Sequence, residues 1–182
     1  RGRAAVQPSP GHGRAAGRSR DRMAGDGHPR GRRRAGDRAD RQQGAPVSRR
    51  LGKQILAAFP GAGADAVYGS TEAEPIAEIL LPELRQYWQH YAGHLVGLPA
   101  VGTEVRIVNP DADLDSESDV DNAAVNADNV GEILVSGKHV LHGYVDNPAA
   151  NKESKIPRAR GDVWHRTGDA GFFDPEGRLW LV

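Results

Sequence analysis

The C-terminal half of the chain is divided into short runs of β-branched and aromatic residues, and this pattern limits the fold more than any other feature. Each run is bounded by Gly, Pro or Asp, which interrupt strands. The runs are Val105–Val108, Glu132–Val135, Val163–His165 and Arg178–Val182. Several short strands in succession predict a small barrel or a meander. We therefore expect an α+β or mixed α/β fold with a barrel-like part.

Helices are expected mainly before this strand-rich part. Apolar residues recur at helical spacing in three segments, and a fourth begins with a capping Asn followed by Pro. The predicted helices are 48–58, 73–79, 83–91 and 148–154, and a short strand is expected at 64–68. Residues 109–129 are acidic and lack a periodic apolar face, so we expect a solvated surface loop there.

Charge divides the chain into two unlike parts. Residues 1–50 hold 14 Arg and 4 Asp, whereas the remaining residues hold 10 basic and 20 acidic side chains. Residues 1–46 contain almost no large apolar side chain and cannot offset the entropy cost of ordering. We therefore expect a disordered basic segment at 1–47 and a partial domain at 48–182.

Three interpretations of the basic segment are open. Its arginines could contact the phosphates of a nucleic acid. It could instead be a solvated tail, or sequence that is translated outside the genuine coding frame. No aromatic residue lies between the arginines to stack on bases, so nucleic-acid binding is the less favoured interpretation.

The sequence also bears on location. No apolar run approaches the roughly 20 residues of a membrane span, and the Arg-rich start lacks the apolar stretch of a secretory signal. The absence of Cys excludes disulfides and thiolate metal sites. We expect a cytoplasmic protein without a membrane span.

Three motifs carry the functional information. The first is Tyr68-Gly69-Ser70-Thr71-Glu72, the second is Gly131–Gly137 with Gly143-Tyr144 and Pro148, and the third is His165-Arg166-Thr167-Gly168-Asp169. The first combines a ring, hydroxyls and a carboxylate on one loop, and the third is expected to end in a turn that presents a carboxylate. The first and third together indicate one nucleotide site.

In this order and spacing, the motifs resemble those of the adenylate-forming, or AMP-binding, enzymes, most closely the acyl-CoA synthetase branch. The resemblance covers about residues 48–182. It implies part of the family's large domain, with a distorted β-barrel-like subdomain and short helices. It also implies activation of a carboxylate, with fatty acids as a candidate class, by ATP and Mg²⁺, and coenzyme A as a candidate acceptor.

The resemblance also assigns roles to residues. Tyr68 would pack on adenine, Gly69 and Ser70 would let the backbone approach the nucleotide, and Thr71 would donate to the α-phosphate. Glu72 would hold Mg²⁺, and Asp169 would accept hydrogen bonds from the ribose hydroxyls. Thr71 and Glu72 are thus the expected catalytic residues, whereas the second motif, including Tyr144, is expected to be structural.

Two parts of the family pattern have no counterpart in the chain. The phosphate loop with its lysine would precede Tyr68, and the domain with the catalytic lysine would follow Val182. We therefore expect a middle slice that does not catalyse adenylation alone. A nucleic-acid-associated protein that uses the basic segment, and a non-catalytic interaction module, are the alternative functions.

Overall fold

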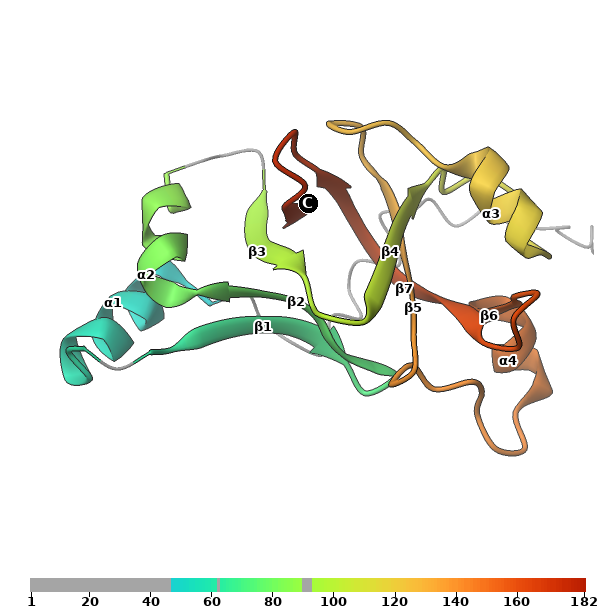
Figure 1. The fold of residues 1–182 in the computed structure, drawn as a ribbon, viewed down its shortest axis with the longest axis horizontal. Helices are drawn as coiled ribbons and strands as arrows, with labels where there is room; N and C mark the ends of the chain where they lie inside the picture. Colours follow the sequence, from blue (N-terminus) through green and yellow to red (C-terminus); the bar gives the residue numbers. More distant parts are fainter. Residues whose placement is uncertain (1–46, 62, 90–92) are drawn as a thin grey trace, which may run out of the picture. The chain divides into compact units, whose positions relative to one another are not determined.

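The structure is a computed structural model that describes residues 47–61, 63–89 and 93–182 (Figure 1). All of these residues belong to one compact unit of the chain. The segment 1–46, for which we expect disorder, lies outside the described residues.

The described residues form an open antiparallel sheet with short helices. The helices are α1 (Arg49–Ala58), α2 (Leu81–Leu84), the 3-10 helix η3 (Arg85–Tyr87), α3 (Glu117–Ala123) and α4 (Pro148–Ser154). The strands are β1 (Asp65–Ser70), β2 (Ala73–Leu80), β3 (His94–Pro99), β4 (Thr103–Val108), β5 (Gly131–Gly137), β6 (Lys155–Pro157), β7 (Val163–Phe173) and β8 (Leu179–Leu181). Their order in the sheet is β1-β2-β3-β8-β7-β5-β4, with β6 paired to β7. The mixed α/β class is confirmed, and the barrel-like part is a sheet that does not close.

Strand β5 lies at the centre of the core. All seven of its residues are buried, and it pairs with β4 on one side and β7 on the other. Because successive side chains point to opposite faces of a strand, Ile133 and Val135 enter one apolar cluster, whereas Leu134 enters another with Val120 and Trp164. The uninterrupted apolar run in this segment is typical of a strand that is covered on both faces.

The predicted helix at 73–79 is wrong, because these residues form most of strand β2. This strand returns from β1 as a hairpin in which Tyr68 lies opposite Ala77. Ile76 is fully buried against β5 residues in the first apolar cluster. Pro75 would also remove a backbone donor from a helix interior. Pairing with β1 and β3 therefore outweighs the weak helical periodicity of this segment.

The acidic segment 109–129 is also not a loop throughout, since it contains helix α3. Ser116 caps this helix by accepting a hydrogen bond from the backbone N–H of Asp119. Val120 is fully buried and fixes which face of the helix meets the sheet. One buried residue in a helix of two turns produces no periodic pattern, so hydrophobic spacing does not detect it.

The remaining helices and strands agree with the predictions in part. The helix predicted at 83–91 is replaced by the short helices α2 and η3, and residues 90–92 lie outside the described part of the chain. Strand β3 was not predicted, because Gly97 and Pro99 weaken its strand pattern. Strand β6 has only three residues. The predicted helices at 48–58 and 148–154 are confirmed as α1 and α4.

Gly131 at the start of β5 provides a test of the packing of β4 and β5. An added Cβ would collide with the carbonyl oxygen of Val108. Gly131→Ala is therefore expected to lower the free energy of unfolding by about 1–3 kcal/mol, since the strands must separate. Urea denaturation measures this change. Gly63→Ala is the control, because a Cβ there meets nothing within 4 Å, and an equal loss in both variants would contradict the explanation.

Candidate functional site

Tyr68 and Asp169 belong to different motifs and are joined by a hydrogen bond. The Tyr68 hydroxyl donates to Asp169 Oδ2 at 2.7 Å, across a sequence separation of 101 residues. Tyr68 lies near the end of β1 and Asp169 lies in β7. The fold therefore brings together the first and third motifs.

Burial determines the charge state of this pair. Burial raises the pKa of the Asp169 carboxyl, and the hydrogen bond from Tyr68 opposes that rise. Burial also raises the pKa of Tyr68, and the neighbouring Asp169 carboxylate adds to this effect. Tyr68 consequently remains a protonated donor at neutral pH. Asp169 Oδ1 has no hydrogen-bond partner among the described residues.

Asp169 lies in a bulge within β7. Leu134 of β5 lies opposite Arg166, but Glu132, two residues earlier, lies opposite Ala170. The segment 167–169 therefore faces a single residue of β5. The expected turn at the end of the third motif is instead a bulge inside a continuous strand, and bulges of this kind re-aim side chains.

Thr167 and Gly168 stabilise the bulge. Gly168 has a φ of 78°, in the left-handed region that favours glycine. The Thr167 hydroxyl donates to the Ile133 carbonyl at 2.9 Å and accepts from the Asp169 N–H at 3.1 Å. Thr167 thus links β5 directly to the backbone of Asp169.

Glu72 lies in the turn between β1 and β2. Its backbone N–H donates to Ser70 Oγ at 3.2 Å, and its Oε1 accepts from the Tyr144 hydroxyl at 2.9 Å. Burial acts to raise the pKa of Glu72, but the hydrogen bond from Tyr144 and the other hydrogen bonds outweigh burial, so the pKa lies below its usual value. His165 also lowers it electrostatically. Glu72 is therefore a carboxylate at neutral pH.

Tyr144 is a site residue that the sequence interpretation missed. We expected it only to pack, yet its hydroxyl reaches Glu72, 72 residues away in the sequence. Helix α4 positions it, because Asn151 Oδ1 accepts from the Tyr144 N–H at 2.6 Å and Asn151 Nδ2 donates to the Tyr144 carbonyl at 2.9 Å. The adjacent Gly143 and the capped helix were visible in the sequence, but the long-range contact was not.

The other residues of the first motif lie on the same hairpin. Thr71 is exposed at its tip. An added Cβ at Gly69 would lie 2.9 Å from the Ala73 carbonyl oxygen. The hairpin itself therefore requires glycine at this position, in addition to any approach of a nucleotide.

The chemistry of Glu72 suits Mg²⁺, which prefers carboxylate oxygen and keeps several waters. The carboxylate is ionised, and Oε2 has no hydrogen-bond partner among the described residues. Within the same residues, no group of three or more His, Asp or Glu side chains is placed to hold a metal ion. A magnesium ion here would therefore depend on Glu72, on water and on phosphate oxygens of a nucleotide.

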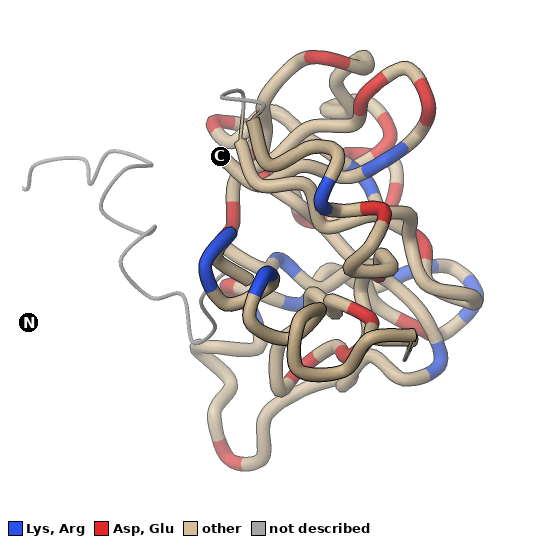
Figure 2. The backbone as a smooth tube through the Cα atoms, turned by 90° about the vertical axis from the view of Figure 1, so that its left-hand side faces the viewer, with Lys and Arg blue, Asp and Glu red and all other residues tan. Residues whose placement is uncertain are grey.

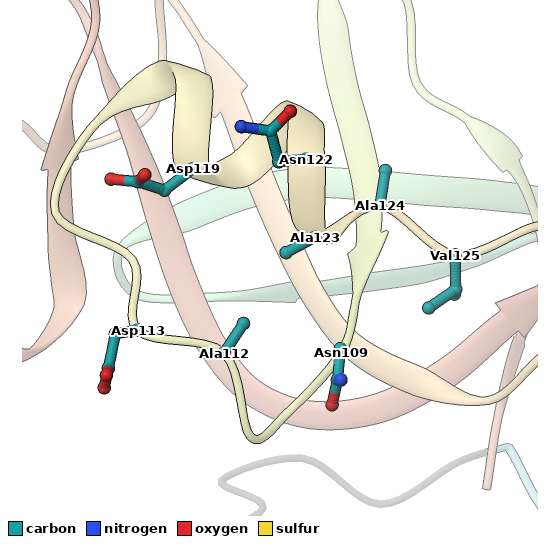
Figure 3. Close-up of a pocket in the computed structure, with 8 residues that line it drawn as sticks. All are labelled: Asn109, Ala112, Asp113, Asp119, Asn122, Ala123, Ala124 and Val125. Carbon is teal, nitrogen blue, oxygen red and sulfur yellow. The ribbon is translucent and has the colours of Figure 1, made fainter.

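A separate cavity of about 480 Å³ lies between α3 and the end of β4 (Figure 3). The close-up shows its polar lining, which includes Asp113, Asp119 and Asn122. None of the predicted site residues contributes to this lining. The cavity is therefore distinct from the Tyr68–Asp169 pair.

The described residues do not form a basic surface. They hold 12 Lys and Arg against 20 Asp and Glu, and Figure 2 shows the basic positions scattered along the backbone. This part of the chain carries a net negative charge, which does not favour binding to the phosphates of a nucleic acid. It also contains no helix long and apolar enough to cross a membrane.

Comparison with known proteins decides the family. Residues 37–145 match the family model for AMP-binding enzymes. The chain belongs to the AMP-binding, or adenylate-forming, enzyme family. The matched region includes the first motif and Tyr144, and the resemblance to this family is confirmed.

Individual relatives agree with this assignment. The chain is 39% identical over 150 residues to olefin β-lactone synthetase of Xanthomonas campestris pv. campestris, covering 76% of this chain and 26% of the relative. It is 30% identical over 138 residues to 4-coumarate–CoA ligase 1 of Arabidopsis thaliana, covering 76% and 22%. The crystal structure of VinN superposes with a TM-score of 0.57 at 28% identity, covering 76% and 31%. The chain thus spans about a quarter of the length of the curated relatives it matches.

Proposed function

We propose that this chain is part of an ATP-dependent acid ligase that activates a carboxylate as an acyl-adenylate. An oxygen of the carboxylate attacks the α-phosphorus of ATP, the bond from that phosphorus to the bridging oxygen breaks, and pyrophosphate leaves. The observation that carries the proposal is the Tyr68–Asp169 hydrogen bond, because it unites two motifs of one nucleotide site. In this proposal, residues 48–182 are part of the AMP-binding domain and residues 1–47 are a basic segment, the end of which falls within the family match that begins at residue 37.

Asp169 and Tyr68 bind the nucleoside in this proposal. Asp169 Oδ2 is occupied by the Tyr68 hydroxyl, so Oδ1 is the oxygen that accepts from a ribose hydroxyl. Tyr68 packs its ring against adenine and holds Asp169 through its hydroxyl. Gly69 and Ser70 allow the hairpin backbone to lie close to the nucleotide.

Thr71 and Glu72 act at the phosphates. Thr71 is exposed at the hairpin tip, where its hydroxyl can donate to an α-phosphate oxygen. Glu72 is held ionised by Tyr144, which suits it to hold Mg²⁺. Bound Mg²⁺ would supply positive charge that stabilises the phosphate oxygens.

The acceptor and the location are part of the same proposal. The name of the relative 4-coumarate–CoA ligase 1 supports coenzyme A as the acceptor of the acyl group. Fatty acids are the first class of carboxylate to test. The absence of Cys agrees with a cytoplasmic location.

Glu72→Ala tests the magnesium assignment. Titration calorimetry of the 182-residue chain with ATP is expected to show tighter binding in Mg²⁺ than in EDTA. The ratio of the ATP affinity in Mg²⁺ to the ATP affinity in EDTA is called the magnesium increment below. Glu72→Ala is expected to reduce the magnesium increment by at least about tenfold, since it removes the protein ligand. The exposed Glu78 of the same hairpin is the control, and Glu78→Ala should keep the increment. A wild-type chain without an increment, or a Glu72→Ala variant that keeps it, would contradict the proposal.

A further inference from the structure

A buried lysine lies beneath the segment that contacts Glu72. Lys155, at the start of β6, is only 9% exposed. Its Nζ donates to the Leu141 carbonyl at 2.6 Å and lies 5.4 Å from the centre of the Tyr144 ring, within the range of a cation–π interaction. Lys155 therefore holds the segment 141–144 at two points.

The same two residues hold Glu72. The Leu141 N–H donates to the Glu72 backbone carbonyl at 2.8 Å, and the Tyr144 hydroxyl donates to Glu72 Oε1 at 2.9 Å. One contact restrains the backbone of Glu72 and the other restrains its carboxylate. Leu141 and Tyr144, which both restrain Glu72, are therefore themselves restrained by Lys155.

Core stability alone does not account for a lysine at this position. Burying an ammonium group is costly unless it is well paired, and no carboxylate lies within ion-pair distance of Lys155 among the described residues. An apolar side chain of similar length would fill the space without that cost. What the ammonium adds is a directional contact with Leu141, attraction to the face of Tyr144 and a longer-range attraction to the Glu72 carboxylate.

We propose that Lys155 is a positioning residue that orients Glu72 toward Mg²⁺ through Leu141 and Tyr144. The proposal rests on the proposed function, because it requires Glu72 to hold the metal. Residues that orient a metal ligand through hydrogen bonds commonly affect metal affinity almost as strongly as the ligand does. Lys155 would not touch the metal or the nucleotide.

The magnesium increment of ATP binding tests this role. Lys155→Met is expected to reduce the increment by about tenfold and to leave ATP affinity in EDTA unchanged. Lys155→Arg keeps a cationic donor and is expected to retain the increment within about twofold. A residue that only filled space would give the opposite pattern, because methionine fills the site better than arginine does.

Tyr144→Phe adds a second arm. This change keeps the ring over Lys155 but removes the hydroxyl that contacts Glu72, so it is expected to reduce the increment as well. Because Lys155 acts partly through Tyr144, the double variant Lys155→Met/Tyr144→Phe should lose less than the product of the two single losses. A loss of the magnesium increment in the double variant equal to the product of the two single losses would overturn the proposal. So would a loss of ATP affinity in EDTA as large as the loss in Mg²⁺.

Failure of this inference can be separated from failure of the proposed function. If Glu72→Ala removes the magnesium increment while Lys155→Met keeps it, only the role of Lys155 is overturned. If the wild-type chain has no increment, the magnesium assignment and the role of Lys155 both fail. Circular dichroism reports whether each variant folds. If Lys155→Met does not fold, the other two variants decide. A folded Lys155→Arg variant that loses the magnesium increment would overturn the proposal. A Lys155→Arg variant that keeps the increment, together with a Tyr144→Phe variant that loses it, would support the proposal.

Discussion

Arg166→Met is expected to lower the free energy of unfolding by about 3–5 kcal/mol, the usual cost of leaving one partner of a buried ion pair alone. Arg166 Nε donates to both carboxylate oxygens of Glu132, at 3.1 and 3.2 Å, and Nη2 also contacts Oε2. Glu132 is only 7% exposed, so water cannot replace the guanidinium. Guanidinium chloride denaturation at pH 7 measures the loss.

The double variant Glu132→Leu/Arg166→Met is the matched control. Replacing a whole buried ion pair with apolar side chains is often nearly neutral, so this variant is expected to regain most of the stability lost by Arg166→Met. An equally unstable double variant would show that packing, and not an unpaired carboxylate, explains the loss.

The Arg166–Glu132 pair also shows how far the motifs could be interpreted from sequence. Glu132 belongs to the second motif, in a segment predicted as a strand, and Arg166 belongs to the third, where the predicted strand 163–165 ends one residue before it. That the two residues would bond to each other was not predictable, because no local pattern states the register of β5 and β7. The same limit applies to the bulge at 167–169, which depends on two extra residues in β7 relative to β5.

Local patterns predicted the fold best where burial dominates. The segments that became β4, β5, β8 and the start of β7 were predicted because their apolar and β-branched residues enter the apolar clusters. Strand β2 was mistaken for a helix, because its pairing with β3 and its burial against β5 come from residues distant in sequence. Helix α3 was missed because a single residue, Val120, fixes it against the sheet.

The residues of the candidate site also differ in whether the sequence alone could predict them. Tyr68, Glu72 and Asp169 were proposed from short motifs, and the structure joins Tyr68 to Asp169 directly. Tyr144 belongs to the second motif but was expected only to be structural, and Lys155 belongs to no motif. Both reach Glu72 only through contacts made by the folded chain. Residues that touch a ligand can therefore be proposed from sequence more readily than the residues that position them.

Asp169→Asn is expected to weaken AMP binding by about tenfold or more while leaving the fold at least as stable at pH 7. A hydrogen bond to a charged group contributes about 1.5–3 kcal/mol, and Asn replaces the free acceptor Oδ1 with an amide nitrogen that only donates, while the Tyr68 hydroxyl keeps the remaining oxygen. Titration calorimetry measures the loss of affinity.

The stability half of this prediction follows from the sign of the pKa shift. Burial raises the pKa of Asp169, so the folded chain binds this proton more tightly than the unfolded chain does. The favourable contribution to stability is therefore present below the unfolded pKa, about 3.9, and is lost as pH rises through the folded pKa. At neutral pH the ionised carboxylate opposes folding. Asparagine removes that cost, and its advantage in urea denaturation should shrink as the pH is lowered.

A ligand without ribose hydroxyls separates a direct contact from a general disturbance of the site. If Asp169 accepts from the ribose, 2′,3′-dideoxy-AMP should bind the wild-type chain and Asp169→Asn with the same affinity, since the hydroxyls that distinguish the two proteins are missing. A substitution that weakened AMP and the dideoxy nucleotide equally would act through the hairpin and Tyr68. The ribose contact would then be rejected, even though Tyr68 and Asp169 lie together in the fold.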